Sequence, residues 1–199
     1  MAYITSTDVK LFGGLADSDT HDDTLLAVMI PIAQQMVDTY TKRTFEYTNT
    51  SDASTVRVFD ADEDVSDRLL ILDMDLHSIR SISVDGTAIS SDSYVTEPRT
   101  STPYWGVKVL GSSSDSWDYG TDAENAIQID GHWAYSQTAP HDIKVATILL
   151  VEYLMKLRNS DIALTAPIIA DGITVMPSQI PAIIRTILNQ YRRPFIGVV

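Results

Sequence analysis

The stretch Ile79-Arg-Ser-Ile-Ser-Val-Asp-Gly-Thr-Ala-Ile89 decides the fold of this 199-residue chain. Residues Ile79 to Val84 have the pattern of a short, half-buried β-strand. Asp85-Gly86 follows, a dipeptide typical of a tight hairpin turn, and Thr87 to Ile89 returns from it. The stretch therefore predicts an antiparallel hairpin.

Further short strand patterns surround this hairpin, and Gly-, Ser- and Asp-rich loops separate them. They are Thr55–Phe59, Arg68–Leu72, Tyr94–Thr96, Gly106–Leu110 and Ala126–Ile129. Such a series between helices indicates a small antiparallel sheet or barrel over about residues 54–135. Trp105, Trp117 and Trp133 fall at its strand ends and loops. We expect these three side chains in the core rather than as platforms for sugars.

Helical patterns occupy both sides of this block. The clearest runs from Asp22 to Arg43, and Pro31 inside it predicts a kink or a late start. Its apolar residues recur at three- and four-residue steps. They are Leu25, Met29, Ile32, Met36 and Tyr40, with Leu26, Ala33 and Val37 beside them.

Two more helices follow the strand block, over residues 140–158 and 179–191. The segment between them, 159–177, contains Asp171-Gly172 and is either a hairpin or a loop that orders only on a partner. The fold class is therefore α+β, with long helices near 22–43, 140–158 and 179–191 and a β insertion at about 54–135. We expect one domain over 1–199 that ends in a C-terminal tail, 192–199.

The chain is acidic, with 27 Asp and Glu against 14 Lys and Arg and a formal charge of −13. This balance argues against a protein that wraps nucleic acid and against an anionic membrane as partner. Residues 1–75 carry 15 acidic and 5 basic side chains, whereas residues 140–199 carry 4 and 6. This asymmetry suggests a molecule with two different ends. Solvated loops and helix N-termini are the alternative explanation.

No reactive constellation stands out. The chain has no cysteine, which excludes disulfides and sulfur-ligated zinc, and it lacks the common zinc, nucleophile-elbow and phosphate-loop motifs. Asp60-Ala-Asp62-Glu-Asp64 resembles the start of a calcium loop, but Val65 and Ile71 replace the Gly and Glu that such a loop needs. We expect no catalytic residue, metal or cofactor. An assembly protein fits better than the alternative, a small enzyme or a carbohydrate-binding domain.

The N-terminus shows no signal-peptide pattern. The longest apolar stretch, Ile143 to Leu154, is too short to span a bilayer. We therefore expect a protein made in the cytoplasm, with no membrane partner.

Five segments occur in a characteristic order along nearly the whole chain. They are Thr7–Phe12, Val37–Phe45, Leu69–Leu72 with Leu76–Gly86, Gly131–Tyr135 with Pro140–Lys144, and Ile183–Arg193. Together they resemble the head–tail connector (adaptor) proteins of long-tailed bacteriophages. Lys42 stands where that family usually has Gly, and Pro31 interrupts the long helix.

The resemblance implies a structural protein of the virion neck without catalytic activity. Such connectors form a ring, usually of about twelve copies, beneath the portal protein. The ring extends the DNA channel, through which DNA passes without specific binding, and offers a surface to a stopper or tail-completion protein. The alternative is that the chain is itself such a stopper or tail-completion protein.

The resemblance also suggests two groups of site residues. The C-terminal segment would dock on the portal, through Ile180, Ile184, Tyr191, Arg192, Arg193, Phe195 and Ile196. Acidic side chains would face the channel and repel phosphates. The candidates are Asp19, Asp22, Asp23, Asp62, Glu63 and Asp64.

Overall fold

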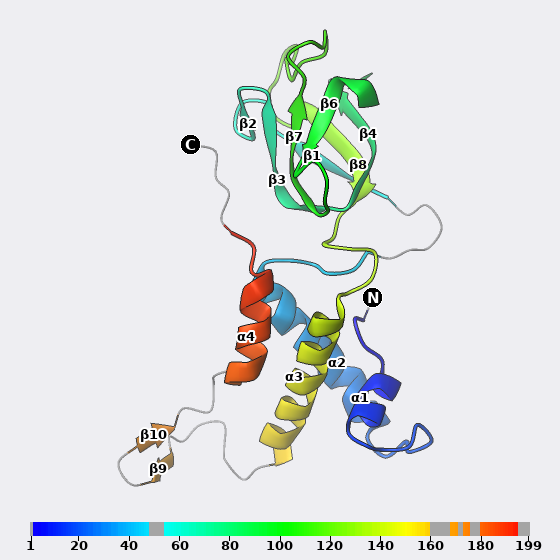
Figure 1. The fold of residues 1–199 in the computed structure, drawn as a ribbon, viewed down its shortest axis with the longest axis vertical. Coiled ribbons are helices and arrows are strands. Elements are labelled where there is room, and N and C mark those ends of the chain that lie inside the picture. Colours follow the sequence, from blue (N-terminus) through cyan, green and yellow to red (C-terminus); the bar gives the residue numbers. More distant parts are fainter. Residues whose placement is uncertain (1, 48–53, 160–167, 171–172, 176–179, 195–199) are drawn as a thin grey trace. The chain divides into compact units, whose positions relative to one another are not determined.

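The computed structural model describes residues 2–47, 54–159, 168–170, 173–175 and 180–194 (Figure 1). Its helices and strands make the fold α+β, as predicted. The chain divides into two compact units. The helical unit comprises residues 2–42 and 140–192, and the β unit comprises residues 43–139 together with Arg193 and Pro194. Within the described ranges, no helix is long and apolar enough to cross a membrane.

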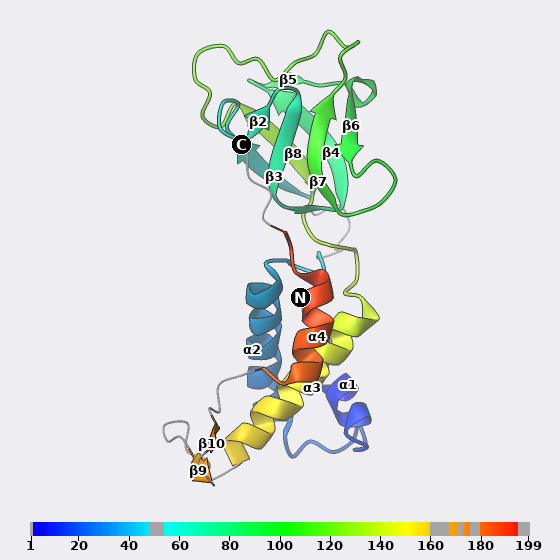
Figure 2. The same ribbon diagram turned by 60° about the vertical axis from the view of Figure 1, so that its left-hand side comes forward.

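The β unit contains two four-stranded antiparallel sheets (Figure 2). One has the order β1-β8-β4-β5 and the other β2-β3-β7-β6. Their strands are β1 (Thr55–Phe59), β2 (Val65–Ser66), β3 (Leu69–Leu76), β4 (Ser78–Val84), β5 (Thr87–Ala88), β6 (Tyr94–Glu97), β7 (Tyr104–Val109) and β8 (Ile127–His132), and a 3₁₀ turn (Ser91–Ser93) precedes β6. The predicted strands are present, and the two-residue strand β2 is an addition, too short to show a period.

Apolar side chains from both sheets form one core. Its members include Phe59, Leu70, Leu72, Leu76, Ile82, Val84, Val107, Val109, Ile127 and Ile129. Trp117 and Trp133 belong to it, and their indole nitrogens donate to the backbone oxygens of Arg68 and Thr55, both at 2.8 Å. The core role predicted for these two tryptophans is confirmed, whereas Trp105 is only half-buried. Each buried indole thus has its polar end satisfied.

Gly131 in β8 permits a close approach between β8 and β4. It pairs with Thr55 on one side and Ile79 on the other. A Cβ at this position would collide with the backbone oxygen of Ser78 and lie 2.8 Å from Leu76 Cδ1. Only glycine therefore fits at this point of the sheet.

The helical unit contains α1 (Ser6–Phe12), α2 (Asp23–Thr41), α3 (His141–Asn159) and α4 (Ala182–Tyr191). In α2 the predicted apolar stripe is displaced by one residue. The buried positions are Leu26, Ile30, Ala33, Val37 and Thr41, whereas Ile32 is 44% exposed. Both sets have helical spacing, so the choice of face depends on the neighbours of α2, chiefly α3 and α4. Helix α2 runs through Pro31 as one element.

The C-terminal helix is shorter than predicted. Helix α4 begins at Ala182, with Pro181 at its N-cap, rather than at residue 179. Ile184 and Leu188 are buried in the helical unit, as expected for its apolar stripe. Strands β9 (Ile168–Ala170) and β10 (Ile173–Val175) pair antiparallel, which confirms the hairpin alternative for this segment. Asp171 and Gly172 lie outside the described residues.

The N-terminal residues cover one side of α2. Tyr3 and Ile4 are buried. The Tyr3 hydroxyl donates to Asp38 Oδ1 at 2.6 Å, and its backbone N–H donates to Gln34 Oε1 at 3.1 Å. Burial raises the pKa of Asp38 from 3.8 to about 6, although the hydrogen bond from Tyr3 acts in the opposite direction. Ionised Asp38 therefore opposes folding near neutral pH.

We predict that Gly131→Ala destabilises the protein by about 1–3 kcal/mol, because the added methyl group overpacks the junction of β8 and β4. Urea unfolding followed by circular dichroism measures the change. Gly111→Ala is the matched control, because no atom lies within 4 Å of a Cβ there. Equal stability of the two variants would contradict the packing argument.

We predict that Asp38→Asn stabilises the protein at pH 7.5 by about 1 kcal/mol, a figure reduced for the partial exposure of Asp38. The folded-state pKa lies above the ordinary value, so the wild type loses stability as pH rises through about 6. The gain should vanish near pH 3, below the ordinary pKa of 3.8, where Asp38 is protonated in both the folded and the unfolded chain. Thermal unfolding at the two pH values tests this, with the exposed Asp62→Asn as control.

Candidate functional site

The described residues present acidic loops, a cavity and exposed apolar surfaces as candidate sites. Among them, no group of three or more His, Asp or Glu side chains is placed to hold a metal ion. The acidic turn after β1 is held by its own hydrogen bonds. The backbone N–H of Asp60 donates to Asp64 Oδ2 at 2.9 Å, and the N–H of Asn125 donates to Asp60 Oδ1 at 2.7 Å. These carboxylates therefore shape a loop.

A second acidic loop, residues 13–22, connects α1 to α2. Helix α1 begins with a capping box, in which the Thr5 hydroxyl accepts from Asp8 N–H and the Asp8 carboxylate accepts from Thr5 N–H. These bonds lower the pKa of Asp8. On the next turn, Lys10 is only 5% exposed, and its Nζ lies 2.6 Å from Asp23 Oδ1 and 3.2 Å from the backbone oxygen of Asp17. One buried ammonium thus ties both ends of the loop together.

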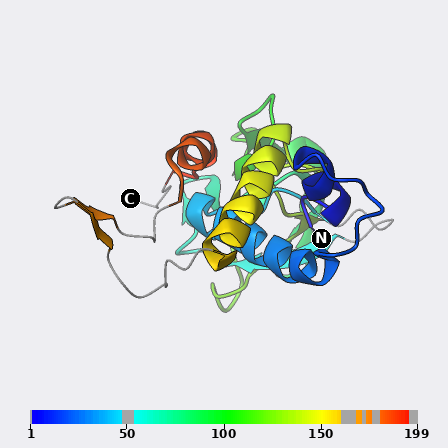
Figure 3. The ribbon, with the colours of Figure 1, turned by 90° about the horizontal axis from the view of Figure 1, so that it is seen from below.

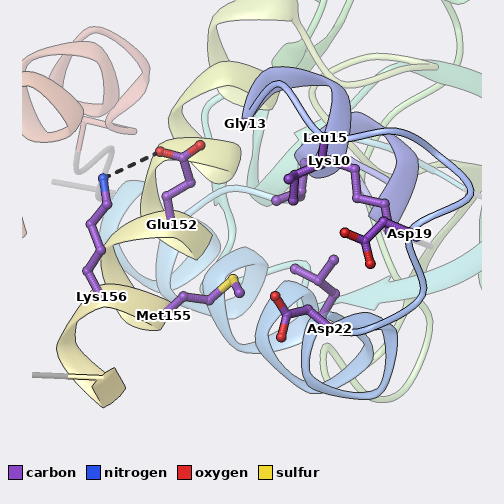
Figure 4. A pocket seen from close by; sticks show the side chains of 10 residues that line it. Lys10, Gly13, Leu15, Asp19, Asp22, Glu152, Met155 and Lys156 are labelled. Carbon is purple, nitrogen blue, oxygen red and sulfur yellow. Dashed lines mark ion pairs between the residues drawn. The ribbon is translucent and has the colours of Figure 1, made fainter.

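A cavity of about 230 Å³ lies between α1, this loop and α3. Apolar groups of Val9, Leu15, Leu26 and Met155 contribute to its lining. Figure 4 shows Asp19 and Asp22 on the side of the loop, opposite the α3 side chains Glu152, Met155 and Lys156. Lys156 Nζ is 3.8 Å from Glu152 Oε2. The cavity is apolar with an acidic rim, which disfavours phosphate ligands.

The predicted channel acids belong to different units. The helical unit contains Asp19, Asp22 and Asp23, and Asp23 forms an ion pair with Lys10. Asp62, Glu63 and Asp64 lie in the β unit, where the first two are exposed and Asp64 closes the turn. The two groups of predicted acids thus fall in separate units.

The predicted docking residues also have different environments. Ile184 is 1% exposed and belongs to the core of the helical unit. The Tyr191 hydroxyl donates to Asp142 Oδ2 at 3.3 Å, and Arg192 is exposed. Phe195 and Ile196 lie outside the described residues. Among the described docking candidates, Arg192 alone is exposed, and Ile180 is partly buried.

Arg193 binds its own chain. Its guanidinium donates to the backbone oxygens of Asp73 at 2.6 Å and Leu72 at 2.8 Å, both on β3. Burial lowers the pKa of Arg193, while nearby Asp75 acts to raise it. Docking through this side chain would first have to break two hydrogen bonds to a charged donor.

Two exposed apolar surfaces of the helical unit were not among the predicted sites. Leu11, Phe12 and Leu15, here named the α1 patch, are 62%, 51% and 47% exposed. The second, the α2 groove, is a hollow of about 430 Å³ lined by Ile32, Gln35, Met36, Thr39, Tyr40 and Ile180. The sequence signal for the patch was an apolar helix end followed directly by Gly13-Gly14. For the groove, the prediction from the sequence was wrong, because helical spacing placed Ile32, Met36 and Tyr40 on the apolar stripe expected in the core.

This chain matches one family model and is similar in fold to solved structures. The model of a family described as head completion protein matches residues 2–194. A chain from the neck of an empty gene transfer agent particle, computed with C6 symmetry, is similar over 98% of this chain and 91% of its own length, with 11% identity and a TM-score of 0.57. A chain from the virion of a native gene transfer agent particle covers 92% of this chain and 84% of its own, with 13% identity and a TM-score of 0.54. No curated protein matches the sequence.

We predict that Lys10→Met destabilises the protein by about 1–2 kcal/mol. The variant keeps an apolar stem but removes the ammonium that joins Asp23 to the loop. The cost stays below that of a fully buried pair because Asp23 is 41% exposed. Urea unfolding provides the measurement, and Lys156→Met, which removes an exposed pair, should change stability by less than about 0.5 kcal/mol. If both variants lost the same stability, the Lys10–Asp23 pair would contribute no more than an exposed ion pair.

Proposed function

Because this chain belongs to the head completion protein family, we propose that it is a structural protein of the virion neck that joins head to tail. The observation that carries the proposal is the family match over residues 2–194, which includes both compact units. The resemblance to head–tail connectors noted in the sequence is confirmed at the level of this family. The likeness to two gene transfer agent chains agrees with it at the level of the fold.

We further propose that the chain forms a ring under the portal and lines a DNA channel. A closed ring needs a heterologous contact, in which one face of each copy meets a different face of the next. The charge of −13 and the exposed acids Asp62 and Glu63 support a channel that repels phosphates. The similar neck chain comes from an assembly with C6 symmetry, which is compatible with a ring here.

The proposed partners are the portal on one side and a stopper or tail-completion protein on the other. For the portal contact we keep the C-terminal segment but favour its exposed member Arg192, with Phe195 and Ile196 beyond it. Ile184 supports the segment from inside the helical unit. In this proposal the protein catalyses no reaction, in keeping with the structural role that the family description implies.

The experiment uses particles of the parent virus assembled without this chain. We predict that their heads package DNA but do not attach tails, and that the purified full-length chain restores attachment. A chain truncated after Tyr191 should fold, as judged by circular dichroism, but fail to bind heads. Arg99→Glu, an exposed change in the β unit, is the control and should bind as the wild type does.

Electron microscopy and infectious titre measure the result. Normal tail attachment without the chain would refute the neck role. If the truncated chain still binds heads, the portal contact lies elsewhere. If the full chain binds only isolated tails, the alternative assignment as a tail-completion protein replaces the connector.

A further inference from the structure

The α1 patch and the α2 groove lie on opposite sides of the helical unit. Figures 1 and 3 both show α3 between α1 and α4. The α1 patch lies at the end of α1, and the α2 groove is formed by the C-terminal half of α2 and Ile180, just before α4. One molecule therefore presents exposed apolar side chains on one side and an apolar hollow on the other.

The surroundings of the α1 patch are acidic. All residues from 11 to 21 are exposed, and Asp17 and Asp19 follow Leu15 within four positions. Asp17 accepts a hydrogen bond from the Thr7 hydroxyl, and Asp19 accepts one from the His21 N–H. Each carboxylate has a second oxygen that can receive a further donor.

The α2 groove has a basic neighbour. Arg185 stands four residues before Asn189, which accepts the Tyr40 hydroxyl at 2.7 Å, so both lie on the face of α4 toward α2. Arg185 is exposed and forms no ion pair with any residue that the structure describes. The groove residues themselves carry no charge. An apolar segment with acidic ends complements this surface.

We infer that the α2 groove receives the α1 patch of a second copy of this chain, with Asp17 and Asp19 of that copy near Arg185. This inference rests on the proposed ring and names the contact between its subunits. The contact joins two different faces, so a pair of copies still has one free patch and one free groove. Only a closed ring covers all of them.

We infer a second copy as the partner because the α1 patch and the α2 groove are both apolar. The charged residues beside them are also opposite in sign, acidic beside the patch and basic beside the groove. Exposed apolar patches on soluble proteins commonly mark association sites. A patch that bound another patch, as in a two-fold dimer, would bring four carboxylates together and would be repelled. The pairing of patch with groove has no such cost.

Engineered cysteines test the contact, because the natural chain has none. Leu15→Cys and Ile32→Cys are both exposed positions, so the single variants should fold. We predict that a mixture of the two single variants forms a disulfide-linked dimer, whereas neither variant alone does so. A chain with both cysteines should form a ladder of covalent oligomers. Val58→Cys, exposed on β1, replaces Ile32→Cys in the control mixture and should give no dimer.

The mixture is oxidised in two preparations, concentrated protein alone and heads to which the chain has bound. A Leu15–Ile32 crosslink in either one supports the contact. Its absence from both overturns the inference, and crosslinking of Leu15→Cys to itself would indicate a two-fold contact instead. Head binding is scored separately, so heads that bind the chain without the crosslink would leave the neck role intact.

Charge reversal gives an independent measurement. We expect Arg185→Glu to weaken self-association by about tenfold in sedimentation equilibrium. Combining it with Asp17→Arg and Asp19→Arg should restore most of the loss. Arg99→Glu serves as the matched control in the β unit. No recovery in the combined variant would remove the ionic part of the contact.

Discussion

Contacts of residues 44–46 with residues 135–136, here called the clamp, hold the two ends of the β unit together. The insertion of the β unit between the two sequence segments of the helical unit depends on this clamp. The Tyr135 N–H donates to the Thr44 backbone oxygen at 2.8 Å, and Glu46 forms a parallel bridge with Ser136. Buried Phe45 packs against the Tyr135 ring at 5.6 Å between centroids. An insertion is compatible with its host when its two ends lie close together, because the host chain then continues almost as if uninterrupted.

The clamp also connects to the sheet. The Arg43 guanidinium binds Asp75 Oδ2 at 2.6 Å and lies over the Tyr135 ring at 5.2 Å. Asp75 is buried at the end of β3, so the ion pair satisfies a carboxylate that would otherwise be costly. With the strand ends anchored, the apolar residues of both sheets can share one core. The helices bury apolar side chains of their own and leave the α1 patch and the α2 groove exposed.

Local patterns predicted most elements but not their environments. The strands around the Asp85-Gly86 turn and the helices α2 and α3 were expected within two or three residues, because side-chain period and turn chemistry act between near neighbours. Residues Ile32 and Ile184 show the limit. Both fit an apolar helical stripe, yet Ile32 is exposed and Ile184 is buried. Helical spacing allows more than one apolar face, and packing against another helix selects between them.

By itself, the sequence determined the α+β class, the order of its elements and the resemblance to connector proteins, and the family match confirms that resemblance. These properties depend on residues close together in the chain. The tertiary structure alone decided which surfaces remain free. The hydrogen bond between Tyr40 and Asn189 joins residues 149 positions apart in the sequence. The Arg193 guanidinium donates to Asp73, which lies 120 positions earlier. Such long-range contacts have no local signature, so the groove beside α4 and the intramolecular role of Arg193 became visible only in the folded chain.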